Sequence, residues 1–309
     1  MTTTPPSAIR ALVEKLQASR GRRAVLLHSA LTADTVPVLY ECLRRVGRTD
    51  GLDLVLSTSG GAIATARRVA MLLREFTEHL TVLVPYRARS AGTLLCLSAD
   101  ELVLGPLAEL GPVDSTMDSG GAGVPDAPDT ISSQDIRAFR SMAEDWFDVN
   151  REEDRLQVLA LLATRIFPAS LSSFYRFDKL VREAAADLLE WQLAGDEHRH
   201  ERDRIVERLV SGYHSHDAVL TRRDVRALGL RACDATDEEE EILWALSQAV
   251  RRTQRYLEPQ PQEEVAGVIA ASDFIGRDII RRARPGEAGE PPGASGGPPN
   301  VNMRWEISD

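Results

Sequence analysis

Ser90 and the pair Gly60-Gly61 are the residues best suited to acyl-transfer chemistry. Each lies directly after an apolar run, and Ser90 also precedes an apolar helix-like segment. Backbone N–H groups in the first turn of a helix have no intrahelical partner, and the helix dipole favours negative charge there. The Ala91 N–H, together with an N–H from the glycine turn, can therefore hold the oxyanion formed when Ser90 attacks a carbonyl.

Ordinary structural roles also explain these residues one at a time. A serine before a helix is a common N-cap, and Gly60-Gly61 is typical of a tight turn. Their combination at the ends of two neighbouring strands is more specific than either alone. The G-x-S-x-G elbow is absent, so the α/β-hydrolase fold is not supported.

A nucleophilic serine needs a base. The only lysines are Lys15 and Lys179, both far from Ser90 in sequence, so a serine–lysine dyad would rest on Lys179. His214 and His216 lie in a short loop between helices, where functional residues are common, although a solvated loop histidine is the alternative. No ligand cluster accompanies this His-x-His, so we expect no metal.

Asp114 closes a Gly-Pro-Val-Asp turn just after the third apolar run. This position predicts that it lies near the sheet edge that bears Ser90. One interpretation is an Asx-turn residue that opens the following loop. The other is the carboxylate that orients a histidine base.

Strand-like and helix-like segments alternate in the N-terminal half, which predicts an α/β fold with a parallel sheet and flanking helices. The expected strands are 23–28, 52–56, 80–85 and 101–104. The expected helices are 6–20, 32–46 with Thr32 as N-cap, 62–76 and 91–97.

The C-terminal half is largely helical in its periodicity, after a Gly/Pro-rich loop over 115–130. A β-rich patch at 265–269 and an alternating segment at 301–307 predict two further strands. The expected organisation is an N-terminal helix (1–22), an α/β core (23–130), a helical region (131–258) with a histidine-containing loop (211–230), and a C-terminal extension (259–309) that is disordered over 284–300.

Composition narrows the functional classes. A net charge of −10 argues against a nucleic-acid-binding surface. Cys42 and Cys96 lie in apolar helix-like surroundings, and three widely spaced cysteines favour neither a disulfide framework nor a zinc site. No apolar stretch resembles a signal peptide or reaches the roughly 20 residues of a membrane span. We therefore expect a cytoplasmic protein without a cofactor.

Several segments together are similar to one known family: 59–61, 84–93, 98–106, 110–114, 212–217 and 220–230. They resemble the serine dehydrogenase proteinase family of the crotonase/Clp-protease superfamily, distant relatives of the Clp proteolytic subunit and of signal peptide peptidase A. The resemblance covers residues 24–230, with a helical insert between its two parts.

The resemblance implies a ClpP/crotonase-like β-sheet spiral that hydrolyses peptide bonds through an acyl-enzyme. It implies a triad of Ser90, Asp114 and His216, with an oxyanion hole from the Gly60-Gly61 turn and Ala91. It also implies a peptide or protein substrate and a homo-oligomer, and it leaves open an unidentified partner protein and the need for an ATPase.

The chain departs from the family pattern at three places. Ser115 replaces an expected proline, Ala218-Val219 replaces an expected Pro-Ile, and the N-terminal membrane segment common in the family is absent. His216 aligns better than His214 because Asp217 follows it. Two rival functions remain: a catalytically inactive oligomeric scaffold with the same fold, and crotonase-type acyl-CoA chemistry, for which the sequence shows no CoA-binding feature.

Overall fold

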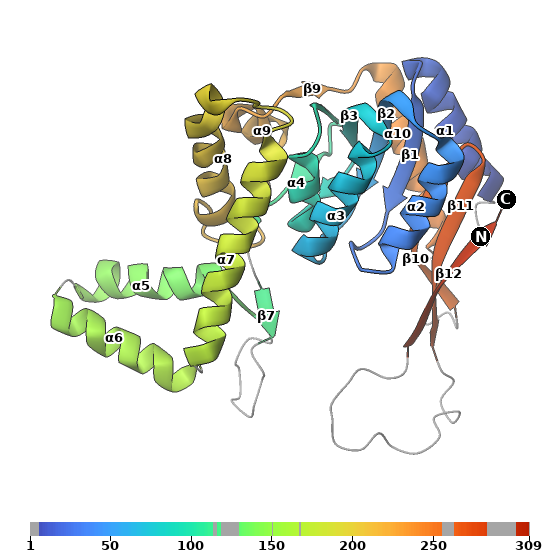
Figure 1. Cartoon of the computed structure of the whole chain (residues 1–309). Coiled ribbons are helices and arrows are strands. Elements are labelled where there is room, and N and C mark those ends of the chain that lie inside the picture. Colours follow the sequence, from blue (N-terminus) through green and yellow to red (C-terminus); the bar gives the residue numbers. More distant parts are fainter. Residues whose placement is uncertain are drawn as a thin grey trace.

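The computed structural model describes residues 6–113, 116–118, 130–149, 151–166, 168–254, 263–282 and 301–308. Its centre is an eight-stranded sheet in the order β12-β11-β10-β1-β2-β3-β5-β9 (Figure 1). The parallel strands are β1 (Arg23–His28), β2 (Thr49–Ser57), β3 (Thr77–Val84), β5 (Glu101–Leu104) and β9 (Ala232–Asp234). The antiparallel strands are β10 (Glu263–Ala271), β11 (Phe274–Arg282) and β12 (Val301–Ser308).

Helices cover both faces of this sheet, which is why its central strands read as continuous apolar runs. Leu54 and Leu56 pack on the side of α2 (Thr35–Val46), α3 (Ile63–Arg74) and α4 (Ala91–Cys96). Val55 points to the other side, where α1 (Pro6–Arg20) and α10 (Asp237–Thr253) lie. The predicted α/β fold with a parallel sheet and flanking helices is confirmed.

The helical region packs beside the core and also projects from it. The long helix α7 (Pro168–Leu189) contacts α3 and α4, and α8 (Arg199–Ser211) packs against α7. A short 3-10 helix, η1 (Asp196–His198), leads into α8, and α9 (Arg222–Leu228) follows it. Helices α5 (Ser133–Phe147) and α6 (Glu152–Arg165) form an arm that extends away from the sheet (Figure 1).

Helix α2 begins three residues later than predicted. Its N-cap is Asp34, whose side chain makes no capping hydrogen bond, so the predicted Thr32 cap is wrong. The reason is that Leu31 forms a parallel bridge with Gly61, which keeps the chain extended up to that point.

Two pairs of short strands lie outside the central sheet. β4 (Arg87–Ala88) pairs in parallel with β6 (Glu109–Leu110). β7 (Thr116–Asp118) pairs with β8 (Thr130–Ser132), so the two ends of the predicted loop 115–130 are joined by strands that were not predicted. The predicted strands at 265–269 and 301–307 are confirmed as β10 and β12. Because β10 pairs directly with β1, the residues after 258 add strands to the core sheet. The expected disordered segment 284–300 lies outside the described residues.

Candidate active site

Ser90 has a strained backbone at the start of α4. Its φ of 51° and ψ of −117° lie outside the ordinary regions for a residue with a side chain, and Asp148 is the other non-glycine residue of the described chain with a positive φ. Such conformations cost about 1–3 kcal/mol. Ser90 occupies the N-cap position, yet its side chain makes no capping hydrogen bond. Helix capping therefore does not explain this serine.

Hydrogen bonds from the neighbouring segments hold the strained turn in place. The Thr58 N–H donates to the Arg87 carbonyl (2.9 Å), and the Arg89 N–H donates back to the Thr58 carbonyl (3.2 Å). The Thr93 hydroxyl donates to the Ala88 carbonyl (2.8 Å). The segments before and after Ser90 are thus tied to β2 and to α4, which offsets the local strain. Sequence analysis missed these threonines, because a single buried hydroxyl leaves no periodic signal.

The glycine turn lies against Ser90. A Cβ on Gly60 would be 3.1 Å from the Ser90 Cβ, and a Cβ on Gly61 would be 2.4 Å from the Leu31 carbonyl oxygen. Both glycines also have positive φ, 118° and 144°. A side chain is excluded at both positions by backbone conformation and by the close approach of neighbouring chain.

Two N–H groups beside Ser90 are available to a ligand. The Leu31 N–H donates to the Gly60 carbonyl (2.8 Å), and the Ala62 N–H donates to the Leu31 carbonyl (2.9 Å). In a parallel bridge of this kind, the N–H of the residue between them, Gly61, points away from Leu31. The Ala91 N–H opens α4 and has no intrahelical acceptor. Neither N–H is hydrogen-bonded to a described residue. The Gly60 N–H, in contrast, donates to the Thr58 hydroxyl (3.0 Å), which favours Gly61 as the donor of this turn.

The histidine-containing loop is anchored next to the serine turn. The Arg89 guanidinium donates from Nη2 to the His216 carbonyl (3.0 Å) and lies 3.4 Å from the Asp217 carboxylate. Leu110 and Leu220 exchange two backbone hydrogen bonds of 3.0 Å and fix the end of the loop. The His216 backbone therefore lies beside the residue that precedes Ser90. His216 is half-buried, and His214 is exposed.

Asp114 lies outside the described residues. The chain that leads to it is fixed, because the Val113 N–H donates to the Leu209 carbonyl (3.0 Å) near the end of α8. The Gly111 N–H donates to the Thr93 hydroxyl (2.9 Å), close to Ser90. The segment before Asp114 thus passes by the serine turn. A contact among the side chains of Ser90, Asp114 and His216 stays a prediction.

Neither lysine has the burial expected of a catalytic base. Lys15 is exposed on α1, and Lys179 is exposed on α7, where its Nζ lies 5.6 Å from the centre of the Tyr175 ring. A lysine base works when it is removed from water. The described chain therefore gives the serine–lysine alternative no support.

The three cysteines differ in exposure, but the pKa of each thiol is raised. Cys42 and Cys96 are buried, and burial raises the pKa of both thiols. The pKa of the more exposed Cys233 is raised to about 11, by partial burial and by the nearby Glu101 carboxylate. Within the described ranges, no three His, Cys, Asp or Glu side chains are grouped to hold a metal ion.

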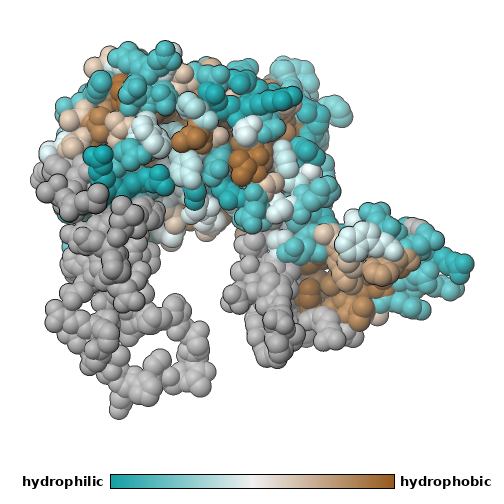
Figure 2. All heavy atoms as spheres, turned by 180° about the vertical axis from the view of Figure 1, so that it is seen from behind, coloured by the Kyte–Doolittle hydropathy of each residue, from teal (hydrophilic) through white to brown (hydrophobic). Residues whose placement is uncertain are grey.

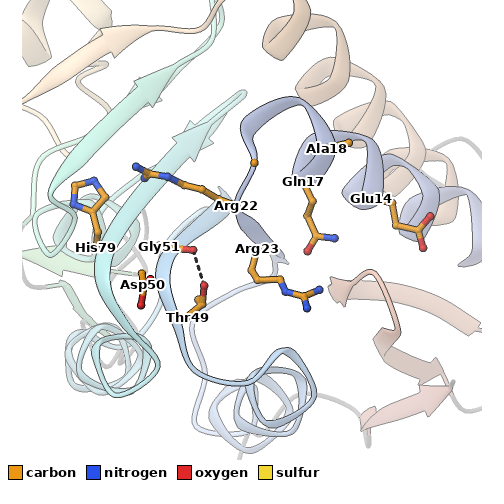
Figure 3. Close-up of a pocket in the computed structure, with 10 residues that line it drawn as sticks. Glu14, Gln17, Ala18, Arg22, Arg23, Thr49, Asp50, Gly51 and His79 are labelled. Atoms are coloured by element: carbon orange, nitrogen blue, oxygen red, sulfur yellow. Dashed lines mark hydrogen bonds between the residues drawn. The ribbon is translucent and has the colours of Figure 1, made fainter.

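A wide cavity lies at the opposite edge of the sheet. It measures about 750 Å³ and opens at the amino ends of β1, β2 and β3, between α1 and the turns before these strands (Figure 3). Its polar lining includes Glu14, Arg22, Asp50 and His79. Because Ser90 lies at the carboxyl edge, this cavity is not part of the candidate site.

Part of the chain is similar to a known family of proteins. Residues 24–127, about a third of the chain, match the family model described as ClpP-like SDH-type serine proteinase. Two uncharacterized proteins of Methanocaldococcus jannaschii, MJ0137 and MJ1495, are 25% and 26% identical over 239 and 232 residues. These alignments cover 76% and 71% of this chain, and 72% and 69% of the two relatives.

Solved structures show a more distant similarity. A mutant of the 1510-N membrane-bound stomatin-specific protease has a TM-score of 0.40 at 12% identity, covering 75% of this chain and 83% of that one. A mutant of ClpP1 from Listeria monocytogenes has a TM-score of 0.35 at 13% identity, covering 74% and 98%. In the part of the chain that the structure describes, no helix has the length and apolar character to cross a membrane. The sequence match over residues 24–127 shows that this part of the chain is similar to the ClpP-like SDH-type serine proteinases.

Proposed function

We propose that this protein is a serine peptidase with Ser90 as its nucleophile. One observation carries the proposal: Ser90 is held at a positive φ at the start of α4, its hydroxyl does not cap the helix, and the glycine turn lies against it. A strained turn between a strand and a helix is a known way to present a nucleophilic serine. The family match supports the same chemistry, since its members are serine proteinases.

The proposed reaction begins with attack of the Ser90 Oγ on a peptide carbonyl. His216 takes the hydroxyl proton, and the tetrahedral oxyanion accepts hydrogen bonds from the N–H groups of Gly61 and Ala91. His216 then gives its proton to the leaving amine, which leaves an acyl-enzyme. A water molecule, deprotonated by His216, hydrolyses this ester and restores the serine. Asp114 orients the imidazole and stabilises its protonated form.

Covalent labelling with a fluorophosphonate tests the proposal. Wild-type protein should react, Ser90→Ala should not, and His216→Ala should react at least about a hundredfold more slowly, as expected for loss of a general base. His214→Ala, two residues away, is the matched control for the base. Ser172→Ala on the exposed side of α7 is the control for the serine.

The outcomes separate the rival functions. Labelling lost in Ser90→Ala and slowed in His216→Ala supports the peptidase and its base, and the same pattern in Asp114→Asn supports the acid. Slowing in His214→Ala in place of His216→Ala assigns the base to His214. A folded wild-type protein that neither reacts nor cleaves peptides contradicts the proposal and favours the inactive scaffold.

We further propose that the protein self-associates through the arm and the adjoining helix α7. Apolar side chains gather on the arm (Figure 2). Those exposed on α5, α6 and α7 include Trp146, Phe147, Leu156, Leu159 and Tyr175. A surface of this kind on a soluble domain usually marks an interaction site. Light scattering should give a mass above that of one chain for wild type and a lower mass for Trp146→Glu, whereas the control Leu107→Glu, exposed elsewhere, should match wild type.

A further inference from the structure

A second cavity of about 230 Å³ lies at the carboxyl ends of β1 and β2. It opens on the face of the sheet that α10 covers, opposite to α4. The proposed peptidase mechanism uses none of its side chains. Its main polar groups come from two strand ends, the turn after β3 and the last turns of α10: His28, Ser57, Tyr86, Arg87, Arg251 and Gln254.

Two arginines line the cavity, and Arg251 gives it a net positive charge. Arg87 is paired with Glu109 and donates from Nη2 to the Tyr86 hydroxyl (2.6 Å). The guanidinium groups of Arg87 and Arg251 lie 4.5 and 5.6 Å from the centre of the Tyr86 ring. Arg87 lies 3.5 Å from the Glu109 carboxylate, but its buried Nε donates no hydrogen bond. Arg251 has no carboxylate partner among the described residues, so one positive charge is left unbalanced. A guanidinium in this state is suited to bind an oxyanion.

Gln254 adds a buried acceptor, whose contact with the His28 imidazole is not a hydrogen bond of normal geometry. Its side chain is almost fully buried, and its Nε2 donates to the Ala266 carbonyl (3.1 Å). That bond fixes which end of the amide is oxygen, because a carbonyl cannot accept from Oε1. Oε1 makes no hydrogen bond of normal geometry to a described residue, which is unfavourable for a buried acceptor unless a ligand or water supplies a donor.

The pKa of the His28 imidazole reflects its burial and the arginine charges around the cavity. Its pKa is lowered to about 4, first because burial disfavours the charged imidazolium, and then because Arg251 and Arg87 repel it; a polar contact with Gln254 acts in the opposite direction. At neutral pH the imidazole is therefore uncharged and does not compete with the arginines for an anion. A bound anion would oppose the arginine charges and raise this pKa.

We propose that this cavity binds a small oxyanion that also carries an O–H or N–H donor. The oxyanion pairs with Arg251 and Arg87, and the donor bonds to the Oε1 of Gln254. Hydrogenphosphate and α-hydroxy or α-amino carboxylates share this chemistry. The volume fits such a ligand, because sites for drug-sized molecules are larger, about 300–1,000 Å³.

Titration calorimetry of the full chain at constant ionic strength tests the site with three probes. Hydrogenphosphate and lactate should bind, and acetate, which lacks the donor, should bind several-fold more weakly. Arg251→Gln should weaken binding about tenfold or more, as expected for loss of a charged hydrogen bond. Arg252→Gln is the matched control, since both arginines are exposed in the last turn of α10.

The results also separate this site from the candidate active site. Binding should be unchanged in Ser90→Ala, and in wild type the NMR titration of His28 should move to higher pH when the ligand is added. Stronger binding of lactate than of phosphate identifies a carboxylate ligand, and the reverse identifies a phosphate. The proposal is overturned if neither anion binds wild type, if acetate binds as well as lactate, or if Arg252→Gln weakens binding as much as Arg251→Gln.

Discussion

The two edges of the central sheet differ in how their polar groups are used. At the amino edge, the wide cavity beside Arg22 and His79 is lined by side chains on strands and on α1 (Figure 3). At the carboxyl edge, Ser90, Gly60 and Gly61 have positive φ, and the N–H groups of Gly61 and Ala91 have no partner in the described chain. Backbone strain and unpaired N–H groups mark the candidate chemistry at the carboxyl edge, whereas the amino edge is marked by a wide polar cavity.

This difference has a physical reason. Parallel strands direct their carboxyl ends into turns that start the next helix, and the N–H groups of those helix starts are unpaired. The turns after β2 and before α4 meet at one place, because Thr58 pairs with the chain on both sides of Ala88. A ligand with developing negative charge is stabilised at such a place and not at the amino edge.

Replacing Ser90, at the carboxyl edge, should change fluorophosphonate labelling more than any replacement at the amino edge. Ser90→Gly should abolish fluorophosphonate labelling, and it should raise the free energy of unfolding by about 1 kcal/mol, since glycine adopts this φ without strain. Labelling and thermal unfolding measured on the same sample check both parts. A loss of stability in Ser90→Gly would show that the turn is not strained in solution.

Gly61→Ala should be the most destabilising of the changes considered at the carboxyl edge. The new Cβ would meet the Leu31 carbonyl at 2.4 Å in a backbone with φ of 144°, so we expect a loss of roughly 2–4 kcal/mol. Gly47→Ala is the control, because its φ is 77° and nothing lies within 4 Å of the new Cβ. It should cost only about 1 kcal/mol. Equal losses in urea unfolding would mean that the close approach to Leu31 is unimportant.

His28 should make the carboxyl edge sensitive to acid. Its folded pKa of about 4 lies below the unfolded value of 6.5, so the unfolded state binds more protons between these values. Stability should therefore fall as the pH drops from about 6.5 to 4, by up to ~3 kcal/mol from this residue. His28→Gln should remove that part of the pH dependence. His79→Gln, half-exposed at the amino edge, is the control; equal acid sensitivity in wild type and His28→Gln would refute the role of His28.

A change at the amino edge should have the smallest effect on the chemistry. Asp50→Asn alters the charge of the wide cavity without touching the carboxyl edge. The rate of fluorophosphonate labelling should stay within about twofold of wild type, because exposed charges at this distance are largely screened. A much larger change would mean that the two edges are coupled.

Much of the fold follows from local patterns in the sequence. The bounds of α1 and β1 agree with the prediction, because a helical apolar stripe and a continuous apolar run are strong signals. β9 was missed, since Ala232–Asp234 is only three residues long and partly polar. The start of α2 was misplaced, because the bridge from Leu31 to Gly61 is a tertiary contact that propensity does not encode.

The candidate sites were likewise predictable only where local sequence patterns define them, and not where tertiary contacts do. Ser90 and the glycine turn were proposed from residue type and spacing, but the backbone around Ser90 is held by hydrogen bonds from Thr58 and Thr93, which cannot be predicted from the sequence. The cavity that we propose to bind an oxyanion was not predicted from the sequence. His28 and Gln254 are more than two hundred residues apart, and only the pairing of β10 with β1 and the packing of α10 bring them together.

Mapping the fluorophosphonate adduct on wild-type protein by peptide mass spectrometry identifies the nucleophile itself. We expect one modified peptide, with the adduct on Ser90, the strained serine beside the N–H groups of Gly61 and Ala91 that have no partner in the described chain. An adduct on a different serine, or no adduct on folded protein, would contradict it.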